Sequence, residues 1–266
     1  NNNDHQYYGF GINGGVLRYQ VDATAADHAF YAGAGLSSSN ELFRIKGNGN
    51  VSIGALFADH AGLTVDKKVG GTHALFGSNT TGVAIESALP GIGFNTYNFD
   101  TRRAIATGYG GYIGVNSSGG GMSLAVSSSS SPAGNAIAMN TAIYIKPDGS
   151  VGLNNTAPNA PLQLSNSVQS RKIVLYEASN NDHMFYGFGI NASTLRYQVP
   201  SSGDNHVFYS GIQADGSNEL FRINGDGNVG VGVSNPGFLL DVGARMRIRS
   251  RPGGSAGLWL NNNANN

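Results

Sequence analysis

The sequence predicts an all-β protein built from tandem modules of short antiparallel strands and hairpins. Three observations indicate this class: a hairpin motif that occurs three times, a long internal duplication, and a composition rich in glycine but poor in charge. The chain has 266 residues, of which 40 are Gly and 12% are charged. Gly is unfavourable inside helices and common in turns, so we expect no long helix. An apolar content of 40% is too high for a disordered chain.

The hairpin motif occurs at residues 43–54, 143–153 and 221–232. Each copy places Asn-Gly or Asp-Gly between two runs of alternating apolar residues, which is typical of a hairpin. A two-residue loop at 48–49 would put the apolar residues on both faces of the hairpin. A three-residue loop instead pairs Phe43 with Ile53 and Ile45 with Val51, all on one face. The sequence therefore predicts the three-residue loop.

Such a loop is a type I turn followed by a residue in the left-handed conformation, where Gly has no Cβ penalty. Pro147 suits the first central position of the turn, because its fixed φ is already correct there. The predicted turn residues of the three copies are Gly47, Asn48 and Gly49; Pro147, Asp148 and Gly149; and Gly225, Asp226 and Gly227.

Two of the hairpins belong to a longer duplication. Residues 4–54 align without a gap with residues 182–232, and 29 of the 51 aligned pairs are identical. A repeat of this kind indicates a tandem array. We therefore expect a repeat module at 1–65, an unlike β module at 66–165, the second repeat module at 166–242, and the start of a further module at 243–266.

Each hairpin is followed by a short closing strand, at 63–65, 162–164 and 240–242. The connection to that strand contains Pro158 in the second copy and Pro236 in the third, but no Pro in the first, so we expect the first connection to differ. We interpret residues 127–131 as a flexible loop. Other strands are expected near 6–12, 16–21, 28–32, 72–77, 83–87, 91–97, 104–108, 112–115 and 122–126.

The chain starts without Met inside a repeat and ends with Leu258, Trp259 and Leu260 before an Asn-rich tail. We therefore expect it to be a segment of a longer polypeptide. Its 16 basic and 16 acidic residues give a net charge of zero and form no basic stripe, which disfavours a nucleic-acid partner. Neither a run of 18–20 apolar residues nor a signal peptide is visible, so no membrane partner is expected.

The size of the modules bears on assembly. A Gly-rich module of this length buries little surface alone and is only marginally stable, and a long β array must also protect its edges. An intertwined homotrimer with its axis along the chain meets both needs. The alternative is a β-sandwich lectin or adhesin module repeated along an extracellular stalk and able to fold as a monomer.

The hairpins also carry a resemblance. The runs FRIKGNGNVSIG and FRINGDGNVGVGVSNPGFLLDV, together with GIGFNTYNF, resemble segments of tail-fibre proteins of bacteriophages and related phage-derived appendages. The resemblance implies a homotrimeric β-structure in a virion tail fibre or extracellular appendage, which carries or contributes to attachment to a host-surface glycan or protein. Many such tail-fibre proteins end in a self-cleaving chaperone domain, which is not evident in this sequence.

The sequence favours no cofactor, metal or catalytic activity. His5 and His28 recur as His183 and His206, and repeated histidines around a threefold axis would be one route to a metal site. The alternative is that His5 and His183 orient a turn and that His28 packs beside Phe30 and Tyr31; no ligand spacing supports a metal.

A glycosidase would need two positioned carboxylates. The repeated acids, however, accompany repeated arginines, as in Glu41 with Arg44 and Glu219 with Arg222, which suits ion pairs on a sheet. Asp100 near Arg102 and Arg103 is similar. If a glycan site exists, we expect it in the unlike module, where aromatic and basic side chains gather. The candidate residues are Tyr97, Arg102, Arg103, Tyr109 and Tyr112.

Overall fold

The computed structural model describes residues 4–54, 62–65, 71–78, 81–87, 89–116, 119–213, 216–249, 252–255 and 257. These residues form 23 β-strands and no helix, which confirms the prediction of an all-β protein. The chain divides into two compact units, Asn1–Asn166 and Ser167–Asn266, and each of their sheets is described by itself.

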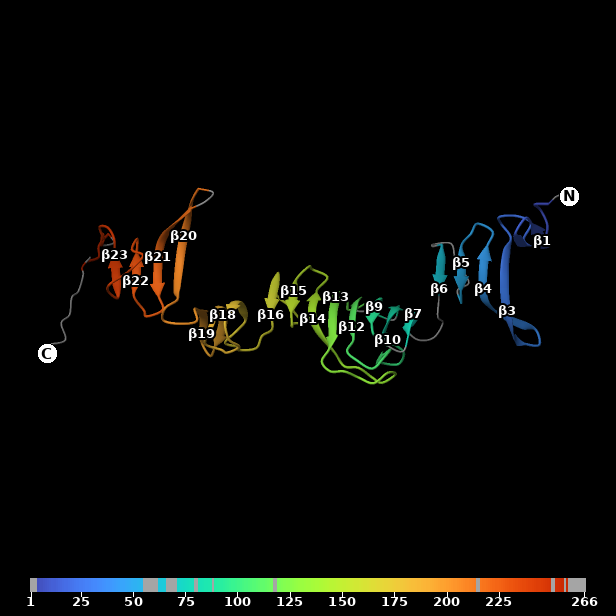
Figure 1. Ribbon diagram of the computed structural model, residues 1–266, viewed down its shortest axis with the longest axis horizontal. Helices are drawn as coiled ribbons and strands as arrows, with labels where there is room; N and C mark the ends of the chain where they lie inside the picture. Colours follow the sequence, from blue (N-terminus) through green and yellow to red (C-terminus); the bar gives the residue numbers. More distant parts are fainter. Residues whose placement is uncertain are drawn as a thin grey trace. The chain divides into compact units, whose positions relative to one another are not determined.

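The first unit begins with a hairpin and a four-stranded sheet (Figure 1). Strands β1 (Gly9–Asn13) and β2 (Val16–Gln20) form the hairpin. The sheet has the order β3-β4-β5-β6. Its strands are β3 (Asp27–Gly35), β4 (Ser38–Lys46), β5 (Val51–Ile53) and β6 (Leu63–Val65).

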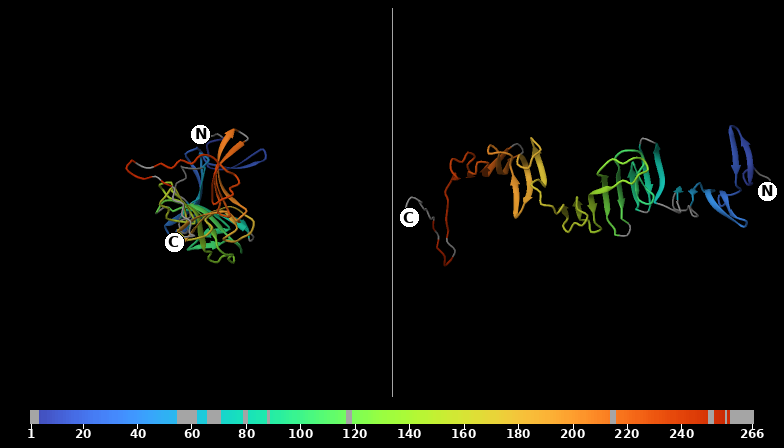
Figure 2. Two further views of the ribbon diagram at one scale, coloured as in Figure 1. Left: turned by 90° about the vertical axis from the view of Figure 1, so that its left-hand side faces the viewer. Right: turned by 90° about the horizontal axis from the view of Figure 1, so that it is seen from below.

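An eight-stranded sheet forms the largest part of the first unit, in the order β16-β15-β14-β13-β12-β9-β8-β7. In Figure 2 its green and yellow strands lie side by side. The strands are β7 (Thr72–Ser78), β8 (Thr81–Glu86), β9 (Gly91–Phe94), β12 (Gly111–Val115), β13 (Met122–Ser127), β14 (Met139–Ile145), β15 (Val151–Leu153) and β16 (Leu162–Leu164).

A small ribbon of β10 (Thr96–Asn98) and β11 (Arg102–Ala104) packs against this sheet and lies nearest to β8. The core lies under this ribbon and the chain that follows it, where Ala84, Ala104 and Ala106 are almost completely buried. Small side chains at these positions allow the covering segments to approach the sheet closely.

The second unit repeats the hairpin and the four-stranded sheet at the start of the first unit, with one strand added to the hairpin. A three-stranded sheet has the order β17-β18-β19, and a four-stranded sheet has the order β20-β21-β22-β23. The strands are β17 (Ile173–Glu177), β18 (Phe185–Asn191), β19 (Thr194–Gln198), β20 (Asn205–Gln213), β21 (Gly216–Asn224), β22 (Val229–Val231) and β23 (Leu240–Val242).

The hairpin register agrees with the prediction from the sequence. Phe43 pairs with Ile53 and Ile45 with Val51. The loop closes through two backbone hydrogen bonds, from Lys46 N to Asn50 O at 2.8 Å and from Gly49 N to Lys46 O at 2.9 Å. The second and third hairpins repeat the same bonds.

The closing strands differ from the expectation of antiparallel strands. β6, β16 and β23 run parallel to β5, β15 and β22. A parallel pair needs a connection that returns to the starting edge of the sheet, and it usually takes a dozen residues or more. Residues 154–161 make this return in the second copy with Pro158 fully buried. In the first copy, the connection that was expected to differ falls on residues 55–61, which lie outside the described residues.

The unlike module departs from prediction at two strands. The strand expected at 91–97 is divided into β9 and β10, because Asn95 adopts a φ of 53° and turns the chain. The prediction of a strand at 104–108 is wrong, since β11 ends at Ala104. Gly108 instead forms an isolated bridge with Ser131.

The loop interpreted as flexible is anchored at both ends. Ser127 is the last residue of β13, and its Oγ accepts a hydrogen bond from Gly110 N at 2.9 Å. Ser131 is buried, and its Oγ donates to Ala136 O at 2.8 Å. The run of serines therefore belongs in part to the core.

The predicted module boundaries stay predictions. No strand forms at the described residues from 243 to 257, and Leu258, Trp259 and Leu260 lie outside the described residues.

Candidate interaction surfaces

One face of the eight-stranded sheet is apolar from edge to edge. Side chains directly opposite one another on neighbouring strands share a face, so the register defines a row across all eight strands. The row consists of Leu164, Leu153, Ile143, Leu124, Ile113, Ile92, Ile85 and Ala74. Parallel rows add Val115 and Met122 on one side, and Phe94 and Val126 on the other.

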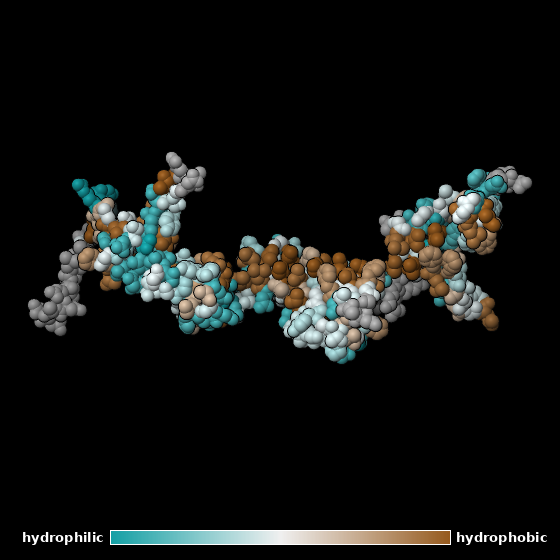
Figure 3. Space-filling model, in the orientation of Figure 1, coloured by the Kyte–Doolittle hydropathy of each residue, from teal (hydrophilic) through white to brown (hydrophobic). Residues whose placement is uncertain are grey.

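This face is open to solvent in the single chain, and we call it the bare face. Ile85, Ile92 and Leu124 are 40%, 41% and 37% exposed although each lies on a strand with a neighbour on both sides. Figure 3 shows hydrophobic residues gathered in a band over β12 to β16. Contiguous exposed apolar patches are uncommon on monomeric proteins, which makes this face a candidate interaction surface.

The opposite face, which we call the covered face, is buried by the chain itself. Ala84, Glu86, Tyr112 and Ala125 alternate with the residues of the bare face and are at most 6% exposed. Because successive side chains of a strand point to opposite faces, β8, β12 and β13 present aliphatic residues to solvent and these four residues to the covering segments. This reverses the usual arrangement of a lone domain.

The four-stranded sheets have the same design. Phe30, Phe43, Ile53 and Val65 form one row of the β3–β6 sheet. In the second unit the corresponding row is Phe208, Phe221, Val231 and Val242. Phe30 and Phe208 are about half exposed, at 50% and 54%. Every four-stranded or larger sheet of the described chain therefore carries one bare apolar face.

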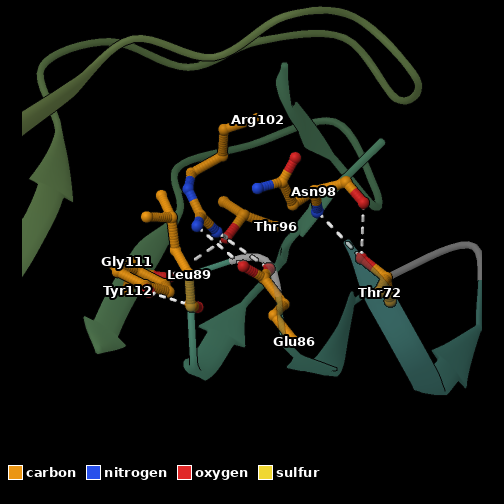
Figure 4. A network of polar contacts seen from close by, with 8 residues as sticks. All are labelled: Thr72, Glu86, Leu89, Thr96, Asn98, Arg102, Gly111 and Tyr112. Atoms are coloured by element: carbon orange, nitrogen blue, oxygen red, sulfur yellow. Dashed lines mark hydrogen bonds and ion pairs between the residues drawn. The ribbon is translucent and has the colours of Figure 1, made fainter. Parts of the chain in front are cut away.

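A buried ion pair holds the covered face of the eight-stranded sheet (Figure 4). Arg102 donates two hydrogen bonds to the carboxylate of Glu86, from Nη1 at 2.9 Å and from Nη2 at 2.8 Å. The side chain of Glu86 is 0% exposed and that of Arg102 is 11% exposed. Such a bidentate pair is stable away from water only because both groups are matched.

Two further side chains complete this network. Arg102 Nη1 also donates to Thr96 Oγ1 at 3.1 Å, and its guanidinium lies 3.9 Å from the ring centre of Tyr112. The Tyr112 hydroxyl donates to Leu89 O at 2.7 Å, and burial raises the pKa of this hydroxyl. The network therefore ties β8, β10, β11 and β12 together.

The structure separates the five predicted glycan residues into three places. Arg102 and Tyr112 belong to the buried network, where their polar groups already have partners. Tyr109 lies with Phe76, Phe94 and Val126 around an open hollow of about 560 Å³ beside the bare face. Tyr97 and Arg103 are neighbours outside that network, as cross-strand partners in β10 and β11.

Tyr97 and Phe99 form a small aromatic patch on the outer side of the β10–β11 ribbon. Thr96, which precedes Tyr97 in β10, is fully buried against the sheet. Successive side chains of a strand point to opposite sides, so Tyr97 points away from the sheet. Phe99 is 61% exposed. Both line a hollow of about 340 Å³ with Thr72, His73, Leu75 and Asn98. Beside it, Arg103 Nη2 and Nε donate to Asp100 at 2.8 and 2.9 Å.

The pKa of the Asp100 carboxyl is lowered to about 2, chiefly by its hydrogen bond from Arg103. The repeated acid and arginine pairs also form as predicted. Arg44 Nε donates to Glu41 Oε1 at 2.7 Å, and Arg222 Nε donates to Glu219 Oε1 at 2.7 Å. These arginines lower the pKa of Glu41 and of Glu219. Each of these carboxylates therefore already has an arginine as its partner.

The turn residues occupy the conformations that the three-residue loop requires. Gly49, Gly149 and Gly227 have φ of 96°, 85° and 100°. Asp148 Oδ1 accepts a hydrogen bond from Ser150 N at 2.9 Å, and this bond is the chief reason that the Asp148 pKa is lowered to about 2.

The sequence alone does not explain why the first turn residue is Gly in the first and third copies but Pro in the second. A Cβ at Gly47 would lie 2.6 Å from Ala26 O, and one at Gly225 would lie 2.3 Å from Ser201 O. Close approach of a neighbouring loop therefore requires glycine in the repeat modules.

The repeated histidines occupy equivalent places. His28 packs against Tyr19 with ring centres 4.5 Å apart, and His206 packs against Tyr197 at 4.4 Å. The expectation that His28 packs beside Phe30 and Tyr31 missed this partner, which comes from another strand pair. Among the described residues, no group of three or more metal-ligating side chains comes together.

No protein-family model matches the chain, and no curated protein matches it either. In the described part of the chain, no helix is both long and apolar enough to cross a membrane.

Proposed function

We propose that this chain is a structural segment of a homotrimeric fibre of the phage tail-fibre kind, which carries or contributes to attachment to a host surface. The observation that carries the proposal is the bare apolar face of the larger sheets. Fibre segments of this type need no catalytic residue and no cofactor. Their chemistry is the burial of apolar surface between copies of one chain.

The exposed side chains supply the driving force for self-association. Fully burying one Leu, Ile or Phe side chain contributes about 1.5–3 kcal/mol. A face whose apolar row crosses eight strands and is partly exposed therefore contributes on the order of several kcal/mol per chain, even after the cost of ordering the partners. Packing copies of the chain together through these faces would bury them, and the resemblance of the hairpins to tail-fibre sequences favours three copies.

The test is the solution mass of this chain over a dilution series, by native mass spectrometry or light scattering. We expect a mass of three times 27.6 kDa that persists on dilution. A folded monomer at all concentrations would contradict the fibre assembly.

A second candidate function is glycan binding at the outer patch of Tyr97 and Phe99. The favouring observation is the partly buried Tyr97 with the exposed Phe99, beside the Asp100–Arg103 ion pair and on the side of the sheet away from the bare face. Aromatic faces and fixed polar groups are the features that suit a sugar ring and its hydroxyls. This patch stays accessible when the bare faces are covered, so the two proposals are compatible.

Glycan binding is tested by titrating an array of surface glycans against the chain and its Y97A/F99A variant. We expect binding to one glycan class and its loss in the variant. Y109A is the matched control, because Tyr109 lies in the other hollow. Equal binding by the wild type and Y97A/F99A would place the site elsewhere.

A further inference from the structure

Each repeat module contains a row of three rings from three strands, in which a Phe and a Tyr stack and a His is tilted against the Tyr. In the first copy, Phe10 and Tyr19 stack at 4.9 Å, and Tyr19 contacts His28 at 4.5 Å. In the second copy, Phe188 and Tyr197 stack at 5.0 Å, and Tyr197 contacts His206 at 4.4 Å. The Tyr–His interplanar angle is 52° in both copies. The same geometry in two places indicates a built feature.

The histidine end of each row of rings lies on the bare face. His28 pairs with Ile45, which pairs with Val51 and then Leu63. His206 begins the equivalent row with Ile223, Val229 and Leu240. The imidazole is thus the polar member of an otherwise aliphatic row, on the surface that the proposed fibre buries.

One nitrogen of each imidazole has no hydrogen-bond partner in the described chain. This atom, Nδ1 of His28 and of His206, is buried. The charged or titratable groups around His28 are His5, Tyr19, Asp22 and Lys46, which line one hollow with it. In the second copy, the counterparts of Asp22 and Lys46 are Pro200 and Asn224, which carry no charge. Around His206, Tyr197 is the ring in contact, and Asp204 is already bonded to Tyr186 and Ser201.

We propose that His28 and His206 make self-association of this chain sensitive to acid. The inference rests on the proposed fibre function. Imidazole changes charge between pH 5 and 8. A neutral ring fits an apolar row, whereas an imidazolium adds a charge that must be desolvated. In a trimer with equivalent rows around one axis, each layer would gather three such charges.

The direction of the effect follows from proton binding. Assembly covers the row that carries the rings, which raises the cost of a charge there, whereas in the dissociated chain the same row faces solvent and a charge costs less. The dissociated state therefore binds more protons, and assembly weakens as the pH falls through the imidazole range.

The experiment measures mass over a dilution series at pH 7.5 and pH 5.5, at constant ionic strength. For the wild type we expect the concentration at half dissociation to rise at least about tenfold at pH 5.5, since each ring can contribute a proton-linked change. If the trimer does not dissociate on dilution, the midpoint of thermal dissociation gives the same comparison.

Three variants make the comparison specific. H28F/H206F keeps an aromatic ring against Tyr19 and Tyr197 but cannot bind a proton, so we expect a response below about threefold. H28Q/H206Q is the second variant, should the larger ring disturb folding. H5Q/H183Q is the matched control, because these repeated histidines are exposed, and we expect it to respond like the wild type.

A trimer whose dissociation ignores pH, or H28F/H206F with the wild-type response, would overturn this inference alone. A monomer at pH 7.5 would overturn the proposed fibre function, and this inference with it.

Discussion

Glu86 and Arg102 form a bidentate ion pair under the β10–β11 ribbon, although they lie 16 residues apart in the sequence. Their carboxylate and guanidinium are out of water on the covered face of a sheet whose other face is apolar. The polar network therefore lies inside the single chain, and the apolar surface lies outside it. This inversion is the central structural property of the protein.

Breaking that pair should be costly. Glu86→Gln leaves the Arg102 guanidinium buried without its counter-charge, and we expect a loss of about 3–5 kcal/mol in the free energy of unfolding. Urea unfolding of each variant measures it. The double variant E86L/R102M should recover most of the loss, because it removes both charges together. D100N at the exposed Asp100–Arg103 pair serves as the control and should unfold at the wild-type midpoint. Equal midpoints for E86Q and D100N would contradict the role of the buried pair.

Glycines in and around the hairpins should differ in their tolerance of alanine. A Cβ at Gly152 would lie 1.9 Å from Asn155 O, so Gly152→Ala should destabilise by about 1–3 kcal/mol or more. Gly149 has open space but a φ of 85°, so Gly149→Ala should cost about 1–2 kcal/mol from conformation alone. Gly237 has open space and no positive φ, and its alanine variant should stay within about 0.5 kcal/mol. Chemical denaturation of the three variants gives the order; G152A as stable as G237A would refute the close approach.

A charge on the bare face should disrupt assembly while leaving the single chain folded. Leu124 is 37% exposed in the middle of the eight-stranded sheet, so Leu124→Glu costs little in a monomer. In the proposed trimer the carboxylate would be buried in an apolar layer, and we expect dissociation to monomers or loss of assembly. Native mass spectrometry and circular dichroism separate these effects. Ser129→Glu, on an exposed loop position, is the matched control. An L124E chain that keeps its trimeric mass would exclude this face from the contact.

The Asp148 carboxyl in the second hairpin turn should have a pKa well below that of an ordinary Asp carboxyl. Its pKa is about 2, because the carboxylate accepts hydrogen bonds from Ser150 N and from Lys146. A depressed pKa in the folded state contributes stability that is present above the unfolded value near 3.9 and is lost as the pH falls through about 2. NMR titration of the Asp148 carboxyl measures the midpoint directly. D148N, which keeps the side-chain acceptor but not the charge, should remove the titration; a midpoint near 3.9 in the wild type would contradict the bond.

The glycan candidates show how much of a site can be predicted from residue types when the contacts between them are unknown. Aromatic and basic residues do gather in the unlike module, and Tyr97 and Arg103 are neighbours as expected. Arg102 and Arg103 are adjacent in the sequence but have different partners. Alternation along β11 directs Arg102 toward Glu86 and Arg103 toward Asp100. That choice depends on which face of β11 meets the sheet, and this is not written in the local sequence.

The sequence by itself determined the hairpins, their three-residue loops and the pairing of Phe43 with Ile53. These features depend on turn chemistry and on a period of two, which act between residues that are close in the chain. Only the tertiary structure decided that the closing strands run parallel, that Glu86 meets Arg102, and that Tyr19 packs against His28. Each of these depends on how separate strand pairs are brought together. The same packing decided which face of each sheet is covered, because the connecting segments lie over the small and polar residues and leave the aliphatic rows to solvent.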